Sequence, residues 1–295
     1  MSLPELAEHP FRRVGALAEL CELLAERSAR NEETVLLAGG TDWIVERHMA
    51  PTAEEGARAY PLVVDVTRLP ELRGIEIAGD RVTLGAATTF LEIRRHPLLA
   101  LRAPLLAAMS REVGAVQIQA RGTVGGNLAT ASPAADGVTA LAALDAEVVL
   151  ASARGERSVP LSSYFTGYKR SVRAADELIR AVVFTLPAEG AITYWRKVGT
   201  RAAQAISKVA LAAVAEKREG RLTRVGLGMA SVAPTVALLP TVRALLLNVL
   251  PETVTEEELD RATLADVAPI DDIRSTGAYR RHVACALVRE FVGRV

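Results

Sequence analysis

Two glycine turns, each followed by a helix-like pattern, constrain the fold of this chain more than any other feature. Gly39 and Gly40 directly follow the apolar run TVLLA of residues 34–38, and the second turn is the run GTVGGN of residues 122–127. Glycine tolerates positive φ values and lets another group approach the backbone closely. Consecutive backbone N–H groups in such a turn form an anion-binding concavity, and a helix that begins there adds its positive end. Two turns converging from separate strands are suited to clamp a pyrophosphate without a lysine.

Both turns differ from the common nucleotide-binding motifs. The first lacks the third glycine and the downstream acid of a dinucleotide-binding βαβ unit, and neither turn carries the Gly-Lys-Ser/Thr sequence of a P-loop. These differences argue against a kinase and against an ordinary NAD-binding domain.

Hydrophobic periodicity predicts an α+β protein made of two units. In the first unit we expect strands at residues 34–38, 62–66 and 146–151, a hairpin at 75–86, and helices at 14–27, 89–95 and 98–110. After Pro187 we expect three strands, at 192–198, 208–215 and 222–229, followed by two or three helices. We place the first domain at residues 1–180, with subdomains at about 1–58 and 59–180, and a smaller α+β domain at 181–295.

Charge and hydropathy limit the kinds of partner that the chain can have. The 295 residues contain 35 basic and 35 acidic side chains, so no global field draws the protein to nucleic acid or to a membrane surface. No stretch approaches the roughly 20 apolar residues that span a bilayer, and residues 1–13 hold no apolar core segment. We therefore expect a soluble, cytoplasmic protein.

The metal-ligating and nucleophilic residue types are sparse. Only Cys21 and Cys285 are present, too few for an iron–sulfur cluster, and their apolar surroundings predict buried structural thiols. The four histidines are scattered without metal-ligand spacing. We predict no metal site and no catalytic acid–base pair, so any redox centre has to be an organic cofactor.

Several motifs resemble one protein family. The strings LLAGGTDW (36–43) and RGTVGGNLATASPAAD (121–136) resemble the two FAD-pyrophosphate motifs of molybdenum hydroxylase flavin subunits, in the order and separation of that family. The stretches at 72–75, 164–170, 176–179, 197–209 and 266–275 resemble the same family. The likeness is to subunits of the xanthine dehydrogenase and carbon monoxide dehydrogenase kind. It implies the two-part FAD-binding fold shared with vanillyl-alcohol oxidase, followed by a small α+β C-terminal domain.

The resemblance also implies a set of FAD-binding residues, none of them catalytic. One side of the pyrophosphate and ribose is assigned to Leu37, Ala38, Gly39, Gly40, Thr41 and Asp42, and the other side to Thr123, Gly125, Gly126 and Asn127. Hydrogen bonds to the ribose and phosphate region are assigned to Thr130, Ser132 and Asp136. Near the isoalloxazine ring the matching residues are Ile179, as an apolar wall, and Lys197, as a cation. Such a cation stabilises the reduced flavin and raises its reduction potential. Without the resemblance, the sequence pattern predicts that Lys197 is a surface lysine in a strand.

The chain departs from the family pattern at three places. Gln119 and Ala120 replace a common Arg-Asn pair, and Trp43 replaces an aliphatic residue, which predicts a packing role. The run RAAQ at 201–204 replaces the more charged loop of NAD-reducing members, which argues against NAD as the acceptor. With two cysteines, the chain is not of the branch whose flavin subunit carries an additional four-iron cluster.

The function that the resemblance implies is electron transfer inside a larger complex. A molybdenum cofactor-binding large subunit would oxidise the substrate, a 2Fe-2S small subunit would relay electrons, and FAD would pass them to NAD, a quinone or oxygen. A dimer of three-subunit units is expected. Two alternatives are a self-sufficient FAD-dependent oxidase or dehydrogenase of the same fold, and an assembly module that has lost the flavin.

Overall fold

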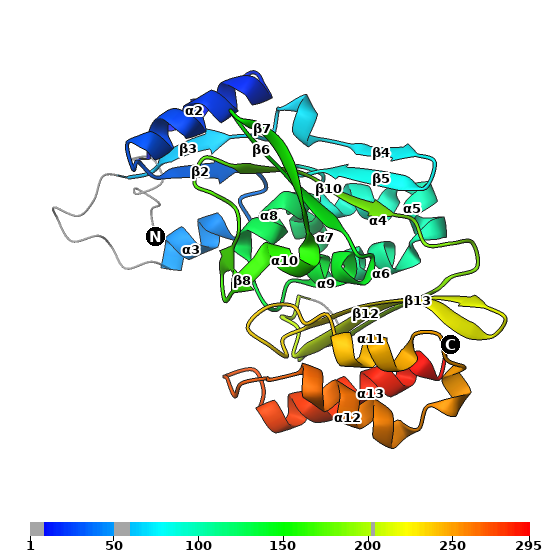
Figure 1. Ribbon diagram of the computed structural model, residues 1–295. Coiled ribbons are helices and arrows are strands. Elements are labelled where there is room, and N and C mark those ends of the chain that lie inside the picture. Colours follow the sequence, from blue (N-terminus) through cyan, green and yellow to red (C-terminus); the bar gives the residue numbers. More distant parts are fainter. Residues whose placement is uncertain (1–8, 50–59, 202–203) are drawn as a thin grey trace.

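The structure is a computed structural model that describes residues 9–49, 60–201 and 204–295. It stacks in layers from the N-terminal helix at the top of Figure 1 to the C-terminal helices at the bottom. The predicted subdomain boundary near residue 58 lies outside the described residues. No helix in the described part of the chain is long and apolar enough to cross a membrane.

The N-terminal layer is a parallel three-stranded sheet covered by one helix. Its strand order is β1-β3-β2, and the elements are β1 (Phe11–Arg13), α2 (Leu17–Ala29), β2 (Thr34–Leu37), α3 (Trp43–Met49) and β3 (Leu62–Asp65). Leu20, Cys21 and Leu24 lie on the buried face of α2, which confirms the predicted helix and its apolar stripe. The chain leaves β2 through the first glycine turn and enters α3 directly.

The central layer is an antiparallel five-stranded sheet of order β4-β5-β10-β6-β7. Its elements are η1 (Pro70–Leu72), β4 (Ile75–Ala78), β5 (Arg81–Gly85), β6 (Glu147–Ser152), β7 (Gly155–Pro160) and β10 (Leu178–Thr185). The hairpin at 75–86 and the strand at 146–151 are confirmed. Strand β10 continues past Arg180 to Thr185 and pairs with both β5 and β6. The predicted domain division at residue 180 therefore falls inside this central strand.

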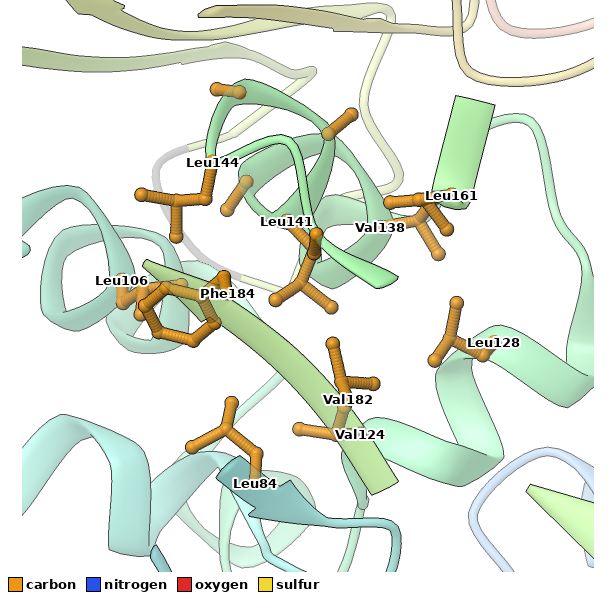
Figure 2. Packing of buried hydrophobic residues seen from close by; sticks show 14 of the residues in the cluster. Leu84, Leu106, Val124, Leu128, Val138, Leu141, Leu144, Leu161, Val182 and Phe184 are labelled. Atoms are coloured by element: carbon orange, nitrogen blue, oxygen red, sulfur yellow. The ribbon is translucent and has the colours of Figure 1, made fainter. Parts of the chain in front are cut away.

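A group of short helices packs on one face of the central sheet. They are α4 (Phe90–Arg95), α5 (Pro97–Arg102), α6 (Pro104–Glu112), α7 (Val116–Gln119), α8 (Val124–Thr130), α9 (Asp136–Ala143) and α10 (Leu161–Tyr164), with the small hairpin β8 (Phe165–Gly167) and β9 (Arg170–Ser171) beside them. The single helix predicted at 98–110 is interrupted at Ala103, because Pro104 has no N–H to donate and starts a new helix. Figure 2 shows Leu128 of α8 and Leu141 of α9 facing Val182 of β10 in the resulting core.

The C-terminal layer is a three-stranded antiparallel sheet between two sets of helices (Figure 1). It comprises β11 (Ile192–Val198), β12 (Val209–Arg218) and β13 (Arg221–Ala230), then α11 (Pro240–Leu246), η2 (Pro251–Thr253), α12 (Glu256–Asp266) and α13 (Gly277–Val292). The three predicted strands and the helices after them are confirmed. A Cβ on Gly226 or Gly228 would overlap a backbone oxygen of α9, so these glycines let α9 press directly on the sheet. This contact joins the C-terminal layer to the helices that follow the second glycine turn.

Candidate cofactor site

The two glycine turns touch each other. A Cβ on Gly39 would overlap the carbonyl oxygen of Arg121 and would lie 3.1 Å from Cα of Gly122. On the other side of this contact, the Thr130 hydroxyl donates a 2.7 Å hydrogen bond to the carboxylate of Asp42. Glycine at position 39 is thus required by the close approach of the two backbones. The structure brings the two predicted motifs together, as the clamp hypothesis expects.

The first turn presents backbone donors that have no acceptor in the part of the protein that the structure describes. Among the described residues, no oxygen accepts a hydrogen bond from the N–H groups of Gly39, Gly40, Thr41 or Asp42. Gly40 has a φ of 74°, which a residue with a side chain rarely adopts. Because backbone N–H groups need a partner, a run of unpaired donors in a tight turn is a place where an anion binds.

The second turn differs from the expectation, because the N–H groups of Val124, Gly125 and Gly126 are already bonded within the protein. The N–H of Val124 donates to the Thr88 carbonyl at 3.0 Å, and that of Gly125 donates to the Ala86 carbonyl at 2.8 Å. The N–H of Gly126 donates to the Thr123 hydroxyl at 3.1 Å, the N-cap bond of α8. The second turn therefore contributes its close-fitting glycine surface, while the first turn supplies the open donors.

A cavity of about 420 Å³ opens beside the turns, within the usual size range of small-molecule sites. Four of its lining residues were predicted site residues: Ala38, Gly125, Gly126 and Ile179. Aliphatic side chains from the N-terminal and central layers form the apolar part of the remaining wall, namely Leu24, Val35, Leu36, Val66, Leu72 and Leu178, and Ser28, Glu32, Glu33 and Thr34 add polar groups. Such a wall suits a flat, apolar ring.

Several lining residues were missed by sequence reasoning. They include Ser28 at the end of α2, Ala86 and Ala87 after β5, and Arg173 in the loop before β10. The small residues at the end of the predicted hairpin at 75–86 and the basic residue between the family-like stretches 164–170 and 176–179 were signals in the sequence. Arg173 is exposed and donates to the Glu177 carbonyl at 2.7 Å, which holds a guanidinium at the edge of the cavity.

Asp136 and Lys197 pair with each other and do not line this cavity. The Lys197 ammonium lies 2.5 Å from the Asp136 carboxylate and also donates to the Glu112 carbonyl at 3.0 Å. The Ser207 hydroxyl donates to the same carboxylate at 2.7 Å. Burial raises the pKa of Asp136, and the ion pair with Lys197 offsets part of this rise. The reading of Lys197 as a surface lysine is wrong, since its side chain is 8% exposed.

The remaining predicted residues organise the segment between α8 and α9. The Asn127 side-chain oxygen accepts from the Val138 N–H at 3.1 Å, and the Ser132 hydroxyl accepts from the Ala134 N–H at 3.2 Å. Both bonds fix the loop that leads from the second turn to Asp136. Leu37 is the last residue of β2, directly before the first turn.

Two of the departures from the family pattern have structural roles. Gln119 is buried; its side-chain oxygen accepts from the Arg94 guanidinium at 2.9 Å and its amide donates to the Arg111 carbonyl at 3.0 Å. The Trp43 ring packs edge-on against His9, which agrees with the predicted packing role. Ala202 and Ala203, in the third departure, lie outside the described residues.

Family models match both parts of the chain. The model for the FAD binding domain in molybdopterin dehydrogenase matches residues 8–188, and the model for the CO dehydrogenase flavoprotein C-terminal domain matches residues 194–295. The chain belongs to the molybdopterin dehydrogenase flavoprotein family. It is 29% identical to the xanthine dehydrogenase FAD-binding subunit of Escherichia coli O157:H7, over 96% of this chain and 94% of that protein. It is also 29% identical to the carbon monoxide dehydrogenase medium chain of Hydrogenophaga pseudoflava, over 97% of this chain and 95% of that protein.

The fold agrees with that of a solved family member. A structure of carbon monoxide dehydrogenase from H. pseudoflava superimposes with a TM-score of 0.86 at 25% sequence identity, covering 96% of this chain and 95% of that chain. The predicted fold class, α+β with a FAD-binding domain and a C-terminal flavoprotein domain, is confirmed. FAD as the cofactor and membership in a molybdenum-containing oxidoreductase family are confirmed as well.

The residues present fit FAD. A dinucleotide with a negatively charged pyrophosphate matches the unpaired N–H groups of the first turn, and a flat ring matches the aliphatic cavity beside it. Among the described residues, no three histidine, cysteine, aspartate or glutamate side chains gather closely enough to hold a metal ion.

Proposed function

We propose that this flavin subunit transfers electrons from a 2Fe-2S subunit to an external acceptor, in a complex whose molybdenum cofactor-binding large subunit oxidises the substrate. The carbon monoxide dehydrogenase relative is named as a medium chain, and the solved relative carries the name of a molybdenum enzyme, which supports this assembly. Both cysteines of the chain are buried, Cys21 in the apolar cluster of the N-terminal layer and Cys285 on α13, and two thiols are too few to hold an iron–sulfur cluster. We therefore expect the electrons to arrive from an iron–sulfur cluster on another subunit. The cytoplasmic location and the three-subunit dimer stay predictions.

The observation that carries the proposal is the contact between the two turns. We place the pyrophosphate on the N–H groups of residues 39–42, held against the glycine surface at Gly125 and Gly126. Thr123 and Thr130 act through other groups: the first caps α8, and the second fixes Asp42. One ring system of FAD then occupies the cavity against Ile179. When bound there, FAD supplies both one-electron and two-electron redox chemistry, which suits it to join single-electron carriers to a two-electron acceptor.

The buried pair of Asp136 and Lys197 supports the site from the C-terminal side. The pair joins the first residue of α9 to β11, and the Trp195 indole adds a 3.1 Å bond to the Glu112 carboxylate at the end of α6. We propose that these contacts seat the C-terminal sheet on the flavin domain. Because the carboxylate balances the ammonium at 2.5 Å, the pair exerts a much smaller field on a nearby ring than an isolated lysine would.

The role in electron exit is testable with the native complex. The complex and a matched complex containing Gly126→Asp, which places a carboxylate at the phosphate site, are reduced with dithionite and mixed with NAD, a quinone or oxygen. We expect the clusters of the native complex to reoxidise rapidly with at least one acceptor, and those of the flavin-free variant to reoxidise slowly with all three. Equal rates in both complexes would show that electrons leave by another route.

The isolated chain separates the two alternatives. Reduction of its bound flavin by a small organic donor, without any partner, would favour a self-sufficient flavoenzyme. A native chain that contains no flavin and has no affinity for FAD would favour an assembly module.

A further inference from the structure

Exposed apolar side chains form a band beside the glycine turns, which we call the collar. They come from the helix after the first turn, the helix before the second turn and the β8–β9 turn, and they are Ile44, Val45, Val116, Ile118 and Tyr168. Their exposed fractions are 41%, 54%, 50%, 39% and 61%. Scattered apolar residues are normal on a protein surface, but a group of them in one region marks an interaction site.

The contacts of the two turns bring the parts of the collar together. A Cβ on Gly40 would lie 3.0 Å from the Ile44 side chain, so α3 starts against the first turn. The N–H of Arg121 donates to the Ile118 carbonyl at 3.1 Å, so α7 ends where the second turn meets Gly39. On the other side, the Lys169 ammonium lies 3.3 Å from the Glu46 carboxylate and ties the β8–β9 turn to α3. Figure 1 shows α3 and β8 on the same flank of the molecule.

The rim of the collar carries positive charge that no described carboxylate neutralises. Arg121 and Arg170 are both exposed, and within the described ranges neither has a carboxylate within 4.0 Å. Arg47 lies over the Trp43 ring at 6.0 Å, and the charge of Lys169 is balanced by Glu46. An apolar centre with a charged rim is the usual anatomy of a protein–protein interface. The charge here favours a partner that is negative.

A subunit that carries a [2Fe–2S] cluster has the required chemistry. With four cysteine thiolates as ligands, the charge of the sulfides and thiolates exceeds that of the two irons, so the cluster and its ligands are anionic. We propose that the collar is the surface on which the 2Fe-2S subunit docks, with Arg121 and Arg170 facing the side that bears the cluster. This inference rests on the proposed function. It places the electron donor directly next to the turns that hold FAD, and close approach is what electron transfer requires.

Assembly measurements on collar variants test the proposal. Val116→Glu puts a charge in the apolar centre, Tyr168→Glu does the same on the hairpin, and Leu101→Glu on α5, at a residue that is 75% exposed, is the control outside the collar. Each full-length variant is loaded with FAD, its flavin content is measured, and its binding to the 2Fe-2S subunit isolated from the native complex is followed on a biosensor. We expect both collar variants to keep FAD and to bind the subunit at least about tenfold more weakly, while the control binds like the native chain.

A charge variant adds a second readout. Arg121→Glu should slow association several-fold at low salt, and the difference should shrink as salt rises, because rim charges act through screened long-range attraction. Wild-type affinity in Val116→Glu and Tyr168→Glu, with FAD retained, would overturn the docking proposal; if Val116→Glu alone loses FAD, Tyr168→Glu decides. A native chain that binds FAD but never binds the 2Fe-2S subunit would instead refute the proposed function.

Discussion

Substitution of Gly39 by alanine should separate the two turns and weaken FAD binding. The added Cβ would lie 2.7 Å from the carbonyl carbon of Arg121, in addition to its overlap with the oxygen. Carbon atoms without a bond between them pack at about 3.5–4.0 Å, so the backbones have to move apart by roughly 1 Å. Overpacking of this kind costs about 1–3 kcal/mol. If FAD binds only when the turns close on its pyrophosphate, that cost raises the dissociation constant of FAD by about 5- to 150-fold.

The assay is an equilibrium titration with FAD, followed by flavin fluorescence. Gly167→Ala is the matched control, because no atom lies within 4 Å of a Cβ at that position and its φ is not positive. We expect native affinity in the control and a clear loss in Gly39→Ala. Unchanged affinity in Gly39→Ala would refute the argument that contact between the turns sets the geometry of the site.

Three further outcomes follow from individual contacts. Thr130→Val removes the 2.7 Å bond to the first turn and should raise the dissociation constant of FAD about 3- to 10-fold in the same titration, with little change in thermal stability. Lys197→Met leaves Asp136 as a buried, unpaired carboxylate and should lower the free energy of unfolding by about 3–5 kcal/mol in urea, a loss that adding Asp136→Asn should largely reverse. The Arg280 guanidinium lowers the pKa of Asp272 from 3.8 to about 2, so the stability that this carboxylate adds is fully present above the upper value and is lost as the pH falls through the lower one; Asp272→Asn should flatten that part of the acid unfolding curve, and an identical curve would contradict the assignment.

The sequence was most informative where local chemistry decides the structure. The strand, glycine turn and helix around Gly39 are encoded by an apolar run, two glycines and the helix-like pattern that follows them, and all three elements form. The break at Ala103 was also encoded, because Pro104 is incompatible with a continuous helix, but the apolar periodicity of residues 98–110 masked it. Local patterns therefore fixed the elements that surround the site.

Contacts between distant segments could not be predicted in this way. The carbonyls of Ala86 and Thr88 accept hydrogen bonds from the N–H groups of Gly125 and Val124 in the second turn. No local sequence pattern indicates that the end of β5 lies against α8. The pairing of Asp136 with Lys197 likewise depends on how α9 meets the C-terminal sheet. The resemblance named both residues, but only the fold shows that each is the other's partner.

The most direct test of the central claim is the FAD content of the purified chain, compared with that of Gly126→Asp. Gly126 faces the cavity, and a Cβ there would approach only the Thr123 hydroxyl, at 3.1 Å, so the variant should fold while its carboxylate repels the pyrophosphate. We predict one FAD per native chain, bound reversibly, and no measurable FAD in a Gly126→Asp chain of native stability. Equal FAD content in the two proteins would contradict the placement of the cofactor between the two glycine turns.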